Sequence, residues 1–330
     1  MHIYQEAMNS SSSTLLDHFD LACWRPAADI HRAFVRYSDH NPSPAKIWRC
    51  APNEGRPVVL SVLIPTWDGY REGYLQKLLA EIHAQTFSGF EIIIIRGDPR
   101  QGRAINIAAE CAQGKYLLTL DDDSSVPDPA TFWKLITVME DHPDIGLAGA
   151  ANQIPENASA FVKRVMKELP RRATQLVKEI TNSDLAEHGC LIMRTAEFKR
   201  LGGENELIPR GLDPYLRQAY RKTGRRVVVV PGAIYHHLPP ASLGKLMRQF
   251  YRNGRQAAFS NRHFPQWIIE TPSHHGNFKS HVPLTIRVCR FPLRLLEALI
   301  RGKLILFLSE VAYGLGFINE WINEWPHSQS

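Results

Sequence analysis

The sequence predicts an α/β fold in which a sheet is flanked by helices. Its 330 residues, 44% of them hydrophobic, are enough to bury the core of one large domain with an appendage. From Val58 onward, short runs rich in β-forming residues alternate with helical patterns, as in repeated strand–helix–strand units. Polar residues follow several of the predicted strands, which indicates a ligand site at one edge of the sheet.

Residues 1–56 precede this alternation and show no sustained periodicity. They contain the serine run at 10–13 and the loop-like stretch DHNPSPAK, and they end in APNEGRP, which is typical of a linker. We treat 1–56 as an N-terminal extension and assign it no function.

Strands and helices alternate in the next segment. Strands are predicted at 58–65 (VVLSVLIP), 90–96 (FEIIIIR), 115–120 (KYLLTL), 144–150, 188–194 and 225–237. Helices are predicted at 70–84, 102–112 and 211–224. The last of these helices ends at Gly224, because glycine readily adopts the backbone conformation that closes a helix.

The carboxyl ends of the first three predicted strands carry polar residues. In an open parallel sheet, ligands bind outside the carboxyl ends of the strands. Three short segments are therefore expected to converge on one crevice, namely Pro65–Asp68, Arg96–Asp98 and Asp121–Asp123.

Three adjacent carboxylates, Asp121, Asp122 and Asp123, follow the third strand. Like charges this close raise one another's pKa unless a cation lies between them. At a strand end, Asp121 and Asp123 leave the same side and Asp122 points away. Two such carboxylates form half of a site for Mg²⁺ or Mn²⁺. The alternative is a solvated turn in which one aspartate caps a helix beginning near Pro129.

Composition argues against several other classes of protein. The 39 basic and 33 acidic residues give a formal charge of +6, a modest excess that does not favour specific nucleic-acid binding. The five cysteines are scattered without a CxxC pair, so neither a disulfide framework nor a zinc cluster is indicated. The N-terminus lacks the pattern of a secretion signal, and we expect a cytoplasmic protein.

The C-terminal region, 241–330, has a mixed basic and apolar pattern. Its longest apolar stretch, Leu304–Ile318, is too short for a convincing membrane span and contains Glu310. Upstream lies a segment typical of a helix on an anionic membrane surface, although a helix packed on the main domain fits equally. Its basic residues are Arg287, Arg290, Arg294, Arg301 and Lys303. An earlier face, solvated or directed at lipid phosphate, consists of Arg248, Tyr251, Arg252 and Arg255.

A family resemblance covers roughly Val58–His237. The stretches SVLIPTWDGY, QGRAINIAAECAQGKYLLTLDDDSSVPDP and LGGENELIPRGLDPYLRQAYRKTGRRVVVVPGAIYHH resemble, in order and spacing, the family 2 glycosyltransferases of the GT-A fold. The resemblance implies a mixed sheet flanked by helices. It also implies a catalytic domain at 57–240, followed by a helical region at 241–330 with possible membrane-surface association.

The resemblance implies a role for the aspartate run. Asp121 and Asp123 are similar to the DxD pair, which binds the metal bridging the donor diphosphate, and Asp121 and Asp122 would contact the nucleotide sugar. Either His236 or His237 is similar to the histidine that completes this metal site.

Further donor contacts are implied on the first two strand ends. Pro65, Thr66 and Asp68 are similar to the loop that contacts the nucleobase and ribose. Three more positions are implied after the second strand, where the family's acidic turn is replaced by RGDPRQG; they are Asp98, Arg103 and Asn106. Arg103 would neutralise phosphate unless it is a solvated residue at a helix start.

Asp213 is similar to the general base of the family. The usual acidic pair is reduced here to Leu212 and Asp213, so a single carboxylate is left to accept the proton of the attacking hydroxyl. The alternative is a surface pair between Asp213 and Arg217, which would contribute only about 0.3 to 0.5 kcal/mol.

The resemblance implies an inverting glycosyltransferase that uses a UDP- or TDP-sugar and Mg²⁺ or Mn²⁺. A glycan or lipid-linked acceptor in bacterial surface polysaccharide or glycolipid synthesis would fit the basic C-terminal region, on the inner face of the membrane. Two alternatives stay open: a non-catalytic membrane-surface binder with the same fold, and a metal-dependent sugar nucleotidyltransferase.

Overall fold

A nine-stranded mixed sheet forms the centre of the protein. The computed structural model describes residues 43–50, 57–174, 176–209, 211–273 and 275–323. The strands are β1 Lys46–Cys50, β2 Leu60–Thr66, β3 Phe90–Arg96, β4 Tyr116–Thr119, β5 Ser124–Ser125, β6 Ile145–Asn152, β7 Thr181–Asn182, β8 Leu191–Arg194 and β9 Arg226–His237.

The strand order explains why the sheet is mixed. It runs β1-β3-β2-β4-β8-β6-β9-β5, and β7 pairs with β9. The pairs β2–β3, β2–β4 and β6–β9 are parallel, whereas β8 is antiparallel to both of its neighbours, β4 and β6. The carboxyl ends of β2, β3 and β4 therefore meet at one edge, as the sequence predicts.

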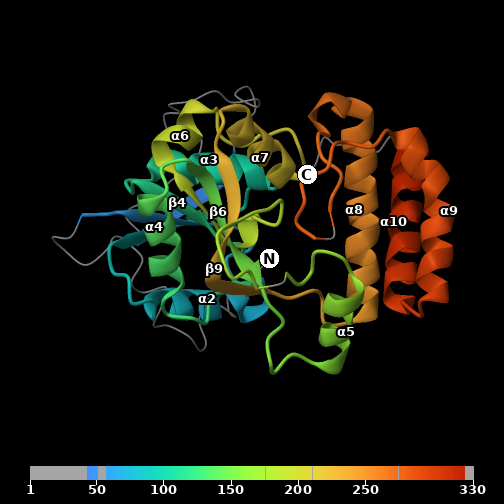
Figure 1. The fold of residues 1–330 in the computed structure, drawn as a ribbon, viewed down its shortest axis with the longest axis horizontal. Helices are drawn as coiled ribbons and strands as arrows, with labels where there is room; N and C mark the ends of the chain where they lie inside the picture. The colour runs from blue at the N-terminus through green and yellow to red at the C-terminus, as the bar shows by residue number, and fades with distance from the viewer. Residues whose placement is uncertain (1–42, 51–56, 175, 210, 274, 324–330) are drawn as a thin grey trace.

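Helices cover both faces of this sheet (Figure 1). One face is covered by α2 Tyr74–His83 and α4 Thr131–Asp141. The other is covered by α3 Gln101–Cys111, α6 Thr195–Arg200 and α7 Leu212–Lys222. The short helical turns are η4 Arg71–Gly73, η5 His188–Cys190 and η6 Pro265–Trp267. Because both faces are covered, central strands such as β3 need a continuous apolar run, FEIIIIR, rather than alternation.

The edge strand β1 lies in the segment that the sequence analysis includes in the N-terminal extension. Lys46–Cys50 pairs antiparallel with β3, and Ile47 and Trp48 are buried. Five residues are too few to show a clear period, and pairing with β3 supplies the order that the pattern lacks. The remainder of the extension, 1–42 and 51–56, lies outside the described residues.

The C-terminal region contains three long helices that lie side by side next to the sheet (Figure 1). They are α8 Leu243–His263, α9 Leu284–Ile300 and α10 Leu304–Ile322. A Cβ atom at Gly254 or Gly316 would lie 2.0 Å from a carbonyl oxygen of the partner helix, so glycine allows the close approach of α8 and α10. Glu168 at the end of α5 (Ala160–Glu168) accepts hydrogen bonds from the backbone N–H groups of Ile305 and Leu306, in the first turn of α10.

Among the described residues, α10 alone is long and apolar enough to cross a bilayer. One such helix is weak evidence for a membrane span. Its Glu310 and Glu320 form ion pairs with Arg294 and Arg255, respectively, within the helical layer. The apolar helix is compatible with membrane association.

Candidate active site

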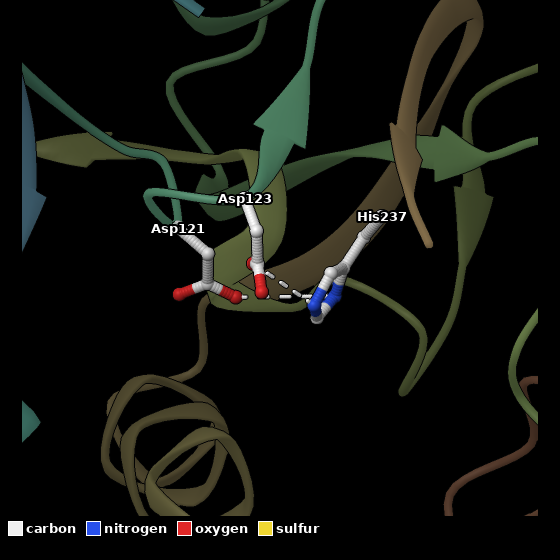
Figure 2. A group of neighbouring side chains, drawn as sticks. All are labelled: Asp121, Asp123 and His237. Carbon is white, nitrogen blue, oxygen red and sulfur yellow. Dashed lines mark ion pairs between the residues drawn. The ribbon is translucent and has the colours of Figure 1, made fainter. Parts of the chain in front are cut away.

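A three-residue cluster lies at the carboxyl ends of β4 and β9. Asp121 and Asp123 follow β4, and the pairing of β5 with β9 places His237 opposite Ser124, directly after them. Potential ligand atoms of Asp121, Asp123 and His237 all lie within 4.8 Å of one another. Figure 2 shows the three side chains pointing toward one another, with His237 Nε2 3.2 Å from Asp123 Oδ1. We call these three residues the acidic cluster.

The donor set of the acidic cluster suits a divalent cation. Two carboxylates and one imidazole match the ligand preferences of Mn²⁺ and, with added water and phosphate oxygens, of Mg²⁺. Burial raises the pKa of Asp121, and the neighbouring Asp123 and Asp213 carboxylates add to this rise. A cation held between the carboxylates would relieve this repulsion.

The two adjacent histidines of β9 point in different directions. Because side chains alternate along a strand, only one of them can face the aspartates. His237 faces them, whereas Nδ1 of His236 lies 2.6 Å from the carbonyl oxygen of Gln153. The acidic cluster therefore contains His237 and not His236.

Asp122 points away from the cluster and toward β2. Thr66, the last residue of β2, donates a hydrogen bond of 2.7 Å from Oγ1 to Asp122 Oδ2. Burial raises the pKa of Asp122 to about 6, and the Asp123 charge contributes to the rise. This bond joins the ends of β2 and β4, so the predicted convergence of Thr66 with the aspartate run is observed.

The loop after β2 places a cation beside the aspartates. Asp68 Oδ1 accepts hydrogen bonds from the backbone N–H groups of Tyr70 and Arg71 and so fixes the turn. The Arg71 guanidinium lies 2.6 Å from Asp123 Oδ2 and 3.4 Å from Asp122 Oδ1. Arg71 has a φ of +51°, which is uncommon for a residue other than glycine. Pro65 is the penultimate residue of β2, just before Thr66.

The candidate donor-binding residues after β3, which are Asp98, Arg103 and Asn106, form buried contacts within the protein. Arg103 is buried and forms an ion pair of 2.8 Å with the buried Asp98, which also accepts a hydrogen bond from Ser43. Asn106 is buried too, and its amide bonds the backbone of Glu204. These contacts hold α3 in place, and a donor-binding role for Asp98, Arg103 and Asn106 stays a prediction.

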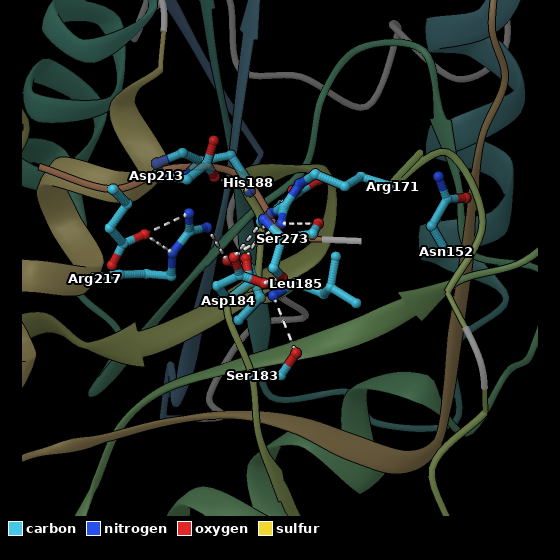
Figure 3. A network of polar contacts seen from close by, with 12 residues as sticks. Asn152, Arg171, Ser183, Asp184, Leu185, His188, Asp213, Arg217 and Ser273 are labelled. Atoms are coloured by element: carbon cyan, nitrogen blue, oxygen red, sulfur yellow. Dashed lines mark hydrogen bonds and ion pairs between the residues drawn. The ribbon is translucent and has the colours of Figure 1, made fainter. Parts of the chain in front are cut away.

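Asp213 lies in the first turn of α7, and its carboxylate is oriented by the backbone. His188 donates a hydrogen bond of 2.8 Å from its N–H to Asp213 Oδ1 (Figure 3). Burial opposes the charged form, but the charges of His188 and Arg217 and this backbone bond outweigh it, so the pKa of Asp213 is lowered. The alternative, a surface pair between Asp213 and Arg217, is not observed, because Arg217 is buried and forms its ion pair with Glu270 at 3.1 Å.

A buried histidine connects Asp213 with the strand that carries the aspartates. His188 Nδ1 lies 3.0 Å from Thr119 Oγ1 on β4, and Nε2 lies 2.8 Å from Glu204 Oε1. Burial alone would lower the pKa of His188, but the Glu204 and Asp213 carboxylates raise it to about 9. The imidazolium therefore places a positive charge close to Asp213 at neutral pH.

The segment that carries the aspartate run matches a known protein family. The family model described as Glycosyl transferase family 2 matches residues 96–200, which include the aspartate run and His188. This segment, about a third of the chain, is similar to glycosyltransferase family 2. No curated protein matched the chain.

Two solved structures are similar to this chain. The mannosyltransferase PcManGT from Pyrobaculum calidifontis aligns with 83% of this chain and 90% of its own, at 13% identity and a TM-score of 0.50. TarS 1-349 from S. aureus aligns with 62% of this chain and 66% of its own, at 16% identity and a TM-score of 0.42. The first likeness confirms the predicted GT-A class, a mixed sheet flanked by helices.

Two further residues lie near Asp213 and were missed by the sequence analysis. Arg171, labelled in Figure 3, forms ion pairs with Asp184 at 3.0 Å and with Glu187 at 2.5 Å. Burial raises the pKa of Glu187, and the Asp213 charge raises it further. Neither residue belongs to a motif quoted above. The one feature that could have indicated Glu187 is its position directly before a predicted strand.

A side chain from α3 also reaches the acidic cluster. Gln101 donates a hydrogen bond of 2.8 Å from Nε2 to Asp121 Oδ1. Gln101 stands at the first position of α3, two residues before Arg103, which the sequence analysis favoured. The position of Gln101 at the start of a helix that follows a strand could have indicated this contact. Its residue type could not have.

Proposed function

We propose that the protein is an inverting glycosyltransferase that moves a sugar from a nucleoside-diphosphate donor to an acceptor hydroxyl. One observation carries the proposal: His188 links the two sites, because its imidazole contacts Thr119 of β4, the strand that leads into the acidic cluster, and its backbone N–H binds the Asp213 carboxylate. A donor-binding carboxylate pair and a separate, ionised carboxylate are the groups that this reaction requires.

Asp121, Asp123 and His237 would hold Mg²⁺ or Mn²⁺ in this proposal. The bound cation supplies neutralisation of the diphosphate leaving group. Thr66, Asp68 and Asp122 are the proposed contacts to the nucleoside, since the first of them bonds the aspartate run directly. PcManGT, which shares the fold, was solved with GDP-Man and Mn²⁺. A UDP- or TDP-sugar is proposed as the donor, and guanosine is included in the test below.

Asp213 would act as the general base. Its lowered pKa keeps it ionised at neutral pH, and the His188 N–H fixes Oδ1. The acceptor hydroxyl passes its proton to Asp213 as its oxygen attacks the anomeric carbon, while the bond to the diphosphate oxygen breaks on the opposite face. A single displacement of this kind inverts the anomeric centre.

The acceptor side would be completed by the C-terminal region. We propose 57–240 as the catalytic domain and 241–330 as a helical region that brings it to the inner face of a bacterial membrane. Exposed apolar side chains on α9 and α10 support this arrangement. A glycan or lipid-linked acceptor in surface polysaccharide or glycolipid synthesis fits a cytoplasmic enzyme at that surface.

The donor site is tested by thermal unfolding with UDP, TDP, GDP, ADP and CDP, each with and without Mn²⁺. One nucleotide is expected to stabilise the wild type only with metal, by about 2.7 kcal/mol at 100 times its Kd. Asp123→Asn is expected to lose this stabilisation, because it removes a charged member of the acidic cluster.

Asp144→Asn is the matched control for this experiment. Asp144 pairs with Arg226 at the amino end of β9, at the other end of the strand from His237. The control should respond to nucleotide and metal as the wild type does. Metal-independent stabilisation, or an unchanged response of Asp123→Asn, would contradict the proposed donor site.

A further inference from the structure

A groove of about 560 Å³ lies between the catalytic side and the C-terminal helices. Its walls come from α8, α9 and α10 and from the segment around η6. On the catalytic side it is lined by Gly211 and Pro214, which stand two residues before and one residue after Asp213. Arg171, the ion-pair partner of Glu187, lines it as well. One end of the groove therefore adjoins the proposed general base.

Three arginines of α9 line this groove at helical spacing: Arg287, Arg290 and Arg294. Arg294 is neutralised by Glu310 of α10, at 2.5 Å. Arg287 and Arg290 form no ion pair with any carboxylate in the part of the chain that the structure describes. Burial and the Arg287 charge lower the pKa of the neighbouring His281. The groove therefore has a positive charge that lacks a partner.

The opposite side of α9 is apolar and exposed. Leu293, Leu296 and Ile300 recur at helical spacing there, and Leu293 and Ile300 are 66% and 77% exposed. A helix of a water-soluble protein normally turns its apolar side inward and its charged side outward. In α9 the arginines line the groove and the apolar side chains of Leu293, Leu296 and Ile300 are exposed, as expected of a helix that contacts lipid.

Further apolar side chains continue this surface onto α10. They are Leu304, Leu315, Ile318 and Ile322. Aromatic residues also line the groove, among them Trp267 and Tyr313. A ligand that matches both features has an anionic group for the arginines and a hydrocarbon chain for the apolar surface.

We propose that the groove binds the phosphate or diphosphate headgroup of a lipid-linked acceptor through Arg287 and Arg290. The hydrocarbon chain leaves the groove along the exposed apolar surface of α9 and α10, and the acceptor hydroxyl reaches Asp213. This inference rests on the proposed glycosyltransferase function and names its acceptor class.

The test is calorimetric titration with farnesyl diphosphate, a soluble isoprenoid diphosphate, in the presence of EDTA so that no metal recruits it to the acidic cluster. The wild type is expected to bind it more tightly than farnesol or inorganic pyrophosphate. Arg290→Ala should weaken binding about tenfold, and the double variant with Arg287→Ala should weaken it further.

Arg301→Ala is the matched control, since Arg301 follows the same helix and pairs with Glu297 outside the groove. It should bind farnesyl diphosphate as the wild type does. Equal affinity in the wild type and in Arg290→Ala, no binding at all, or equal affinity for pyrophosphate would each overturn the proposal. The metal-dependent nucleotide response is measured on the same variants. If that response persists while farnesyl diphosphate fails to bind, the groove assignment alone is wrong; if the wild type lacks it, the donor site fails.

Discussion

Asp213→Asn is expected to lower kcat by about 10²- to 10⁴-fold while the affinity for the donor nucleotide stays unchanged. Asparagine keeps an oxygen that can accept the hydrogen bond from the His188 N–H, so the start of α7 should retain its structure. It cannot accept the proton of the acceptor hydroxyl. The loss should therefore appear in the chemical step and not in donor binding.

Glu187→Gln is the informative comparison for this variant. Glu187 is another carboxylate whose pKa is raised by the Asp213 charge, and it is already paired with Arg171. We expect a smaller loss of kcat from Glu187→Gln than from Asp213→Asn. Steady-state transfer rates and nucleotide thermal shifts should be measured on both. A larger loss from Glu187→Gln, or a loss of donor affinity in Asp213→Asn, would contradict the base assignment.

Glu204→Gln is expected to remove a pH-dependent part of the stability. The His188 pKa is raised from its ordinary value near 6.5 to about 9 in the folded protein, with Glu204 as its closest carboxylate. A raised folded-state pKa stabilises the protein fully below the unfolded pKa, and this contribution disappears as the pH rises through the folded pKa. The contribution is about 3 kcal/mol below pH 6.5 and is absent above about pH 9.

The measurement is the free energy of unfolding in urea, for wild type and Glu204→Gln, between pH 6 and 10. The difference between the two proteins should be largest near pH 6 and should shrink toward pH 9 and above. Glu197→Gln is a suitable control, because Glu197 is also buried but pairs with the arginine Arg225 and not with a histidine. A gap between wild type and Glu204→Gln that is constant over this range would show that His188 does not titrate as described.

Much of the sheet follows from local pattern. The runs VVLSVLIP, FEIIIIR and KYLLTL are apolar and bounded by breakers, so the three parallel strands and the polar segments at their carboxyl ends can be read directly. Strand alternation also limits the histidine choice to one of two residues. The choice of His237 depends on the pairing of β5 with β9. β5 consists of only two serines, and the sequence pattern does not predict this pairing.

The contacts of the site depend more strongly on tertiary packing. Arg71 reaches Asp123 across 52 positions of the sequence, from a turn whose backbone conformation no residue type there predicts. Arg103 carries the charge expected of a phosphate ligand, and the structure adds that it is buried and paired with Asp98. Charge and spacing identify candidates, but burial decides which of them face the ligand.

The C-terminal helices show a third limit of prediction from the sequence. Periodicity correctly indicated amphipathic helices, and the sequence left open whether α9 packs on the main domain or lies on a membrane. The structure adds that its arginines line a groove while its leucines are exposed. An amphipathic pattern defines two faces, and only the neighbouring elements determine which one points inward.

Arg71 is a counter-ion for Asp122 and Asp123 at the proposed donor site. Its guanidinium already neutralises Asp123, so the three aspartates can coexist in the folded protein before any ligand arrives. A divalent cation that binds Asp123 must compete with this arginine, and a bound diphosphate would offer the displaced guanidinium a new partner. In the proposed enzyme, binding of the metal would therefore be an exchange of cations at Asp123.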